Sequence, residues 1–129
     1  MGRSVLAVIA GFVATIVLSV ACDALVRALA PAAFGPDGRT PSPAMMAFGV
    51  AYTLLAATAG GFLTGRIAGR REVMHALVLG TVGAIATLVI ILAAPAGERT
   101  AGMFLSAMLV IPAAVLGGWL RTRGKRGKV

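Results

Sequence analysis

Cysteine, histidine, tyrosine and tryptophan each occur once in this sequence, asparagine is absent, and only four residues are acidic. A single cysteine cannot form an internal disulfide bond, so the chain is not a disulfide scaffold. The one histidine, His75, has no cluster of Cys, His or carboxylate residues around it and makes no metal site by itself. The sequence therefore predicts no metal site and no cofactor.

Charged residues are also scarce, at 12%, whereas 59% of the 129 residues are hydrophobic and the mean hydropathy is +0.96. A soluble domain is about half apolar and about a quarter charged. The apolar residues form four runs, each near the ~20 residues that cross a hydrocarbon core as a helix. We therefore predict an all-α polytopic membrane protein, a single domain of four transmembrane helices in an antiparallel bundle. The expected helices cover about 4–29, 44–65, 73–94 and 100–120, followed by a basic tail at 121–129 too polar to fold alone.

The first apolar run, Val5 to Cys22, has two interpretations. With Arg3 before it, the run resembles a cleaved signal peptide, and its end, Ser19 to Cys22, resembles a lipoprotein cleavage box. However, Ser19 stands where a large aliphatic residue is usual, the run is long for a signal peptide, and three more apolar runs follow. We interpret it as the first transmembrane helix.

Lysine and arginine lie unevenly at the ends of the expected helices. Nine lie on one side, at Arg3, in the turn at 66–71 and in the tail, and three lie on the other side. The positive-inside rule puts the basic side in the cytoplasm, and an even number of spans requires both termini on one side. We predict a multi-pass protein of an inner (plasma) membrane with both termini in the cytoplasm.

The formal net charge of +8 would suggest nucleic-acid binding in a soluble protein. Here membrane topology explains the basic residues first, so we expect no nucleic-acid partner. Anionic lipid head groups attract each Lys or Arg near a membrane surface by about 1 kcal/mol. The residues expected at cytoplasmic head groups are Arg66, Arg70, Arg71, Arg121, Arg123, Lys125, Arg126 and Lys128.

Small residues recur at every fourth position of the second span, a spacing that lets two helices approach closely. The expected packing residues are Gly49, Thr53, Ala57, Gly61 and Gly65, with Gly80 of the third span. Such a face could form a dimer, or it could pack within a single four-helix bundle. We favour packing within the bundle, because with 17 glycines such spacings also arise by chance.

Asp23, Arg27 and His75 are polar residues with a possible functional role near the ends of the spans. Asp23 and Arg27 are four residues apart with the acid first, the favoured order for a helical ion pair. His75 is expected to hydrogen-bond locally, near Glu72 and Arg71. No Ser-His-Asp set can assemble, because Asp23 and His75 are expected on opposite sides of the membrane.

Tyr52, in the second span, is the most central strong polar group, and its hydroxyl needs a hydrogen-bond partner in a dry environment. We expect that partner to be Thr15, Ser19 or a backbone carbonyl freed by Pro112, which should kink the fourth span. A pore-lining role for Tyr52 is the alternative.

The segment from Gly60 to Gly80, GGFLTGRIAGRREVMHALVLG, resembles a pattern in small, uncharacterised bacterial four-helix inner-membrane proteins. Their Gly-Gly-aromatic helix end is followed by a basic turn and a His-Ala start to the next helix. The resemblance implies location and architecture but no activity. The chain departs from the small multidrug exporters, which carry a membrane-embedded Glu in the first helix, and from the small dimeric fluoride channels, which carry a membrane Asn.

These features favour a protein that is not an enzyme and acts as a structural or accessory subunit through helix packing. It would bind a second copy of itself or another membrane protein. The alternative is a small homo-oligomeric transporter or channel, which would need a continuous polar path. Apart from Tyr52 and several Ser and Thr residues, the spans offer no such path.

Overall fold

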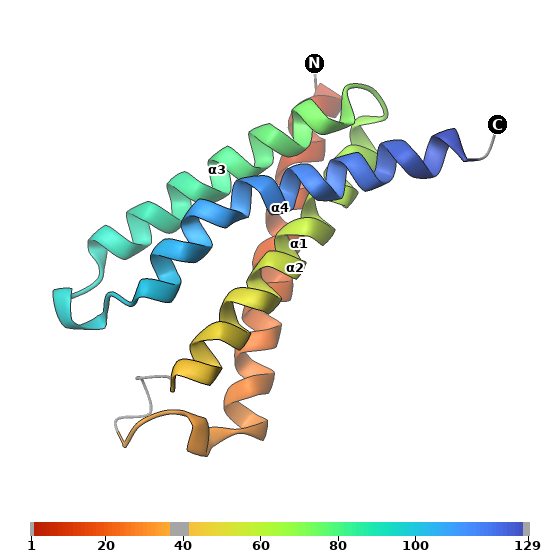
Figure 1. The fold of residues 1–129 in the computed structure, drawn as a ribbon. Helices are drawn as coiled ribbons and strands as arrows, with labels where there is room; N and C mark the ends of the chain where they lie inside the picture. Colours follow the sequence, from red (N-terminus) through yellow and green to blue (C-terminus); the bar gives the residue numbers. More distant parts are fainter. Residues whose placement is uncertain (1, 37–41, 128–129) are drawn as a thin grey trace.

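The computed structural model describes residues 2–36 and 42–127, with Arg126 described by its backbone only. Four long helices follow one another along the chain (Figure 1): α1 (Gly2–Leu29), α2 (Pro43–Ala68), α3 (Glu72–Ala93) and α4 (Ala101–Arg126). Two short 3-10 helices, η1 (Pro31–Ala33) and η2 (Ala96–Glu98), lie in the connections. Each long helix is apolar and long enough to cross a membrane, which confirms the prediction of four such helices.

The helix boundaries follow local sequence signals. The Ser42 hydroxyl accepts a hydrogen bond from the Met45 amide (3.3 Å), with Pro43 in the first turn of α2. At the other end, Gly69 closes α2 with φ 70°, a left-handed conformation that glycine adopts without strain. Arg99 closes α3, because its guanidinium donates to the Leu92 and Ala94 carbonyl oxygens (3.0 and 3.1 Å).

Two helices are longer than the sequence suggested. α2 continues to Ala68, and α4 continues to Arg126, so the prediction of a separate basic tail is wrong up to that residue. The extension of α4 lies against α3, where the Thr122 hydroxyl and the Lys125 ammonium hydrogen-bond the Glu72 carboxylate. A segment too polar to fold alone thus continues the helix because a neighbouring helix binds it. Residues 128–129 lie outside the described residues.

The four helices form two hairpins that cross one another. α1 lies along α2, α3 lies along α4, and the two pairs diverge toward their loops in Figure 1. The main contact between the hairpins is between α2 and α4, whereas α1 touches α3 only slightly. The start of α1 lies beside the end of α2, where Arg3 Nε donates to the Ile67 carbonyl oxygen (3.0 Å).

Small residues fill the interior and large apolar residues point outward. The buried hydrophobic residues are mostly alanines, together with Leu79, Ile91 and Val110. By contrast, Leu29, Leu55 and Met108 are 75%, 70% and 76% exposed. Large contiguous apolar surfaces of this kind mark membrane or protein contacts.

Glycine lets α2 approach both neighbouring helices closely. A Cβ atom at Gly61 would lie 2.0 Å from the Ala114 carbonyl oxygen of α4, closer than real Cβ atoms come to any atom. Toward α1, Gly60 and Gly11 face each other, and a Cβ at either would lie 2.8 Å from the carbonyl oxygen of the other. The small-residue faces of α2 therefore pack within the chain.

Three more of the predicted packing residues are Ala57, Gly65 and Gly80. Ala57 is 1% exposed, and a Cβ at Gly80 would lie 2.9 Å from the Ile111 Cα of α4. At Gly65, a Cβ would lie 3.2 Å from Glu72 Cβ. These three residues, like Gly61, lie at contacts between helices.

Gly49, the first of the small residues spaced every four positions along α2, does not contact a neighbouring helix. A Cβ at Gly49 would meet only the Tyr52 side chain of its own helix within 4 Å. Met46 and Val50 make the contact with α4 at this level, where a Cβ at Gly102 would lie 2.5 Å from Met46 Cγ. Gly49 lies beside that contact, so the prediction that it packs against another helix is wrong. Thr53, one turn closer to the crossing, lines a cavity between the hairpins.

Pro112 lies inside α4, which is bent near its middle in Figure 1. Proline has no amide hydrogen to donate to the Met108 carbonyl, and its ring crowds that carbonyl, so a bend is the expected result. The bend directs the second half of α4 across α2.

Candidate functional site

Tyr52 and Asp23 connect α2 to α1 near the loop between these helices. The Tyr52 hydroxyl donates a hydrogen bond to Asp23 Oδ1. The expectation that Tyr52 binds Thr15, Ser19 or a carbonyl freed by the α4 proline is therefore wrong. Sequence reasoning missed this pair because it assigned the Asp23 carboxylate to Arg27, its neighbour one turn along the same helix.

Arg27 lies one turn beyond Asp23 on α1. Its guanidinium carbon lies 4.7 Å from the centroid of the Phe34 ring, within the range of a cation–π contact. The contact holds the segment after η1 against the end of α1. Near it, the Tyr52 ring meets Phe48 edge to face, with centroids 5.6 Å apart.

Glu72, which the sequence reasoning did not select, is the buried charged residue of the described chain, at 7% exposed. Its Oε2 accepts a hydrogen bond from the Thr122 hydroxyl (2.9 Å), and its Oε1 accepts one from the Lys125 ammonium. Lys125 also donates to the Gly69 carbonyl oxygen (3.2 Å). This Glu72 cluster (Glu72, Thr122 and Lys125) ties the start of α3 to the end of α4.

A sequence signal for this cluster did exist. Glu72 opens the third apolar run and Lys125 follows the fourth, so a tight α3–α4 hairpin brings their positions together. The signal was obscured because residues after Leu120 were not expected to be helical. Lys125, predicted to contact lipid head groups, instead binds a carboxylate within the chain.

His75 lies in the first turn of α3. Its Nδ1 lies 3.0 Å from the Arg71 carbonyl oxygen, the local hydrogen bond that was expected. Arg71 itself has φ 48°, the left-handed conformation that turns the chain from α2 into α3. His75 lies at the start of α3 and Asp23 lies toward the end of α1, and these two helix ends are far apart in the molecule (Figure 1).

The other predicted head-group residues lie at the same end of the molecule as the Glu72 cluster. Arg66, Arg70 and Arg71 are exposed around the α2–α3 turn. Arg123 stacks on the Trp119 ring, with 4.2 Å between its guanidinium carbon and the ring centroid. Arg121 is half-buried and its Nε has no hydrogen-bond partner within the described residues. The Arg126 side chain and Lys128 lie outside them.

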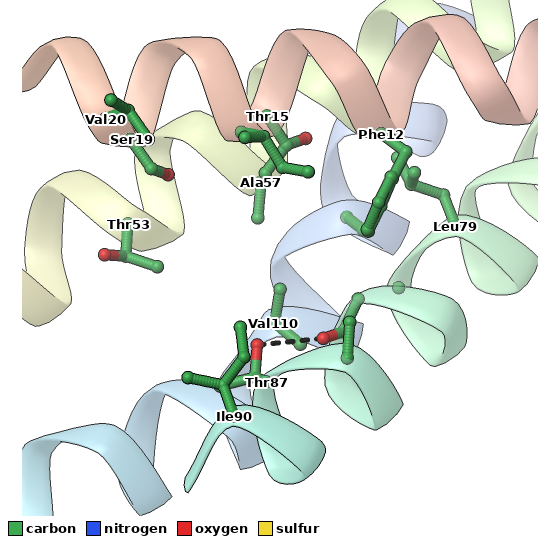
Figure 2. A pocket seen from close by; sticks show the side chains of 15 residues that line it. Phe12, Thr15, Ser19, Val20, Thr53, Ala57, Leu79, Thr87, Ile90 and Val110 are labelled. Carbon is green, nitrogen blue, oxygen red and sulfur yellow. Dashed lines mark hydrogen bonds between the residues drawn. The ribbon is translucent and has the colours of Figure 1, made fainter. Parts of the chain in front are cut away.

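A cavity of about 270 Å³ lies between the hairpins, and all four helices line it (Figure 2). Its walls are mainly apolar. They also carry four hydroxyl groups, from Thr15 and Ser19 of α1, Thr53 of α2 and Thr87 of α3. Gly80 and Ala114, which lie at the contact between α3 and α4, also line the cavity.

Within residues 2–36 and 42–127, no group of three or more His, Cys, Asp and Glu residues could hold a metal ion. The carboxylates of Asp23 and Glu72 each bind a partner from another helix. The described residues thus provide a packed helical scaffold, polar links between helices and an apolar cavity.

Comparisons with known proteins add no family. The chain matches no protein-family model, and neither the curated proteins nor the solved structures contain a significant match to it.

Proposed function

We propose that the chain is a multi-pass protein of a bacterial inner membrane, with its four helices in an antiparallel bundle and both termini in the cytoplasm. The outward-pointing apolar residues of all four helices support insertion. The excess of Lys and Arg at the end that carries the α2–α3 turn supports the orientation. The resemblance of the Gly60–Gly80 hairpin to small bacterial inner-membrane proteins agrees with this location.

In this orientation the exposed arginines contact anionic head groups of the cytoplasmic leaflet. Arg66, Arg70 and Arg71 are exposed and lie at one end of the bundle. Lys125 contributes less, since its ammonium already binds Glu72. The pair of Asp23 and Tyr52 lies toward the opposite face.

Within the membrane the protein acts without catalysis, as a structural or accessory subunit that binds another membrane protein or a second copy of itself. The exposed face of α1 is the observation that carries this proposal. α1 is the least buried of the four helices and packs mainly on α2. Val13 and Val17, in its middle, are 52% and 59% exposed.

A partner meets this face through van der Waals packing, because lipid tails are as apolar as the side chains themselves. The closest-packed glycines are not available for that contact. Gly61 already touches the Ala114 backbone, so a large side chain there would disrupt the chain itself rather than a dimer. The accessible surface of α1 is instead made of bulky aliphatic residues.

A photo-crosslinking amino acid at Val13 tests the proposal in native membranes. Val89 of α3, 60% exposed, is the matched control on the other hairpin. We expect a discrete crosslinked protein from Val13 and a much weaker one from Val89. Crosslinks to lipid alone from both positions would contradict a subunit role, and mass spectrometry of a discrete product separates a foreign partner from a second copy.

A homo-oligomeric transporter or channel is the second candidate, and the cavity between the hairpins favours it. The hydroxyls of Ser19 and Thr53 line one part of that cavity, although its walls are mostly apolar. The mass of the purified protein in lipid nanodiscs tests this second candidate. A monomer would eliminate the homo-oligomeric channel, whereas a stable oligomer would make transport assays the next step.

A further inference from the structure

We infer that the cavity between the hairpins is a binding site for one acyl chain of a membrane phospholipid. The inference rests on membrane insertion, the first part of the proposed function, and is independent of a subunit role. It begins with the shape of the site. The wall comprises α1 residues from Phe12 to Val20 and α3 residues from Leu79 to Ile90, with shorter contributions from α2 and α4 (Figure 2).

Two of the four hydroxyl groups of the wall bind their own helices. The Thr15 hydroxyl donates to the Gly11 carbonyl oxygen, and the Thr87 hydroxyl donates to the Gly83 carbonyl oxygen, each at 2.8 Å. Figure 2 draws the second of these bonds at the cavity wall. The remaining hydroxyls are those of Ser19 and Thr53, in a wall that is otherwise almost entirely apolar.

The volume of the cavity also favours an apolar occupant over water. Apolar cavities of about 150 Å³ stay dry and accept apolar molecules. This cavity, at about 270 Å³, is larger. Its volume lies below the usual size of a site for a whole drug-sized ligand, about 300–1,000 Å³, which favours a single hydrocarbon chain.

The cavity opens sideways between α1 and α3, which make few contacts with each other. Ile16, Val20 and Ile90 line it and are 46%, 59% and 65% exposed, so they form its rim. All three are aliphatic and belong to candidate membrane spans. In a bilayer the opening therefore meets lipid chains rather than water.

The residues beyond the rim favour a phospholipid over a free hydrocarbon. Ile16, Val20, Asp23 and Arg27 recur at spacings of four, three and four along one face of α1. Arg27 thus follows Val20 by seven residues, about 10 Å along the helix axis. When the acyl chain of a phospholipid lies in the cavity, the anionic phosphate of that lipid lies at the level of the Arg27 guanidinium.

The test uses the full protein in nanodiscs that contain phosphatidylcholine with a diazirine in the middle of one acyl chain. After photolysis, mass spectrometry locates the labelled residues. We expect label on Thr15 and Ala86 of the cavity wall as well as on outward-facing Val89. Label on Val89 without label on the wall would overturn the inference, and absence of label on Val89 would instead show that membrane insertion has failed.

A filled cavity provides the second arm. A Cβ at Gly83 would have Val110 as its nearest neighbour, at 3.7 Å, so Gly83→Leu enters the cavity without a backbone clash. Its side chain displaces a few methylene groups of the lipid and should lower wall labelling about tenfold. Ala51→Leu, on an exposed face of α2, should leave it unchanged. Ala86→Leu fills the same space if Gly83→Leu does not fold, and undiminished wall labelling in a filled variant would refute the site.

Discussion

Glu72, the first residue of α3, binds Lys125, which lies 53 residues later in the last turn of α4. The two side chains are unequally exposed, at 6% for Glu72 and 44% for Lys125. Removal of one partner from a buried pair leaves the other charge uncompensated, and the cost rises with the burial of the remaining charge. The two partners should therefore respond differently to substitution.

We predict that Lys125→Gln destabilises the protein more than Glu72→Gln. Lys125→Gln leaves a buried carboxylate with only the Thr122 hydroxyl as donor and should lower the free energy of unfolding by about 2–3 kcal/mol. Glu72→Gln leaves a lysine that solvent reaches and should lower it by about 1 kcal/mol. Reversible unfolding in mixed micelles measures both losses. Lys125→Arg, which keeps the charge, is the control and should lose less than either. Equal losses, or the reverse order, would show that the buried carboxylate does not depend on the lysine.

The crossing of the hairpins should tolerate almost no added volume. A Cβ at Gly117 of α4 would lie 2.0 Å from the Thr58 carbonyl oxygen, which belongs to the backbone of α2 and cannot rotate away. We predict that Gly117→Ala lowers the free energy of unfolding by about 1–3 kcal/mol, the usual cost of overpacking. Gly83→Ala is the matched control, because its Cβ would meet Val110 at an ordinary 3.7 Å. Similar stability of the two variants would mean that the helices do not cross at this distance.

The number and type of the long elements could be predicted from the sequence, because a run of about 20 apolar residues specifies a helix almost irrespective of its neighbours. Helix ends that depend on local capping were also predictable, as at Ser42 and Pro43. The end of α4 was not. Residues after Leu120 are helical because Glu72 binds Thr122 and Lys125, a tertiary contact that composition does not reveal.

The interior was predictable only in part. The i+4 spacing correctly marked Gly61 and Gly65 as helix contacts but not Gly49, because periodicity does not say which residues of α2 face α4 at a given level, and there they are Met46 and Val50. The partner of Tyr52 was missed for a related reason. Asp23 and Arg27 form a favourable pair along one helix, and only the packing of α1 on α2 shows that the carboxylate accepts the Tyr52 hydroxyl.

The bond between Tyr52 and Asp23 should stabilise the α1–α2 hairpin. We predict that Tyr52→Phe, which removes the hydroxyl and keeps the ring, costs about 1–2 kcal/mol, because the acceptor is a carboxylate. A double-mutant cycle with Asp23→Ala, followed by unfolding in micelles, isolates the pair. The coupling energy should account for most of the Tyr52→Phe effect. Additive losses would mean that the two residues contribute independently.

Cysteine labelling in intact cells tests the proposed topology directly. Cys22 is first replaced by Ala, which removes the one native thiol. Gly97 in η2 and Gly124 near the end of α4 have no atom within 4 Å of an added Cβ, so a cysteine at either position is sterically accepted. Because the basic end of the bundle should remain in the cytoplasm, a membrane-impermeant maleimide should label Gly97→Cys at once. It should label Gly124→Cys only after the membrane is permeabilised.

Arg70→Cys, in the exposed α2–α3 turn, is a second cytoplasmic position and should behave like Gly124→Cys. The reverse pattern would invert the bundle and move the Glu72 cluster to the outer face. Immediate labelling at all three positions would contradict insertion itself. The three positions are informative together, because an even number of crossings puts position 124 on the side of position 70, whereas one crossing fewer would separate them.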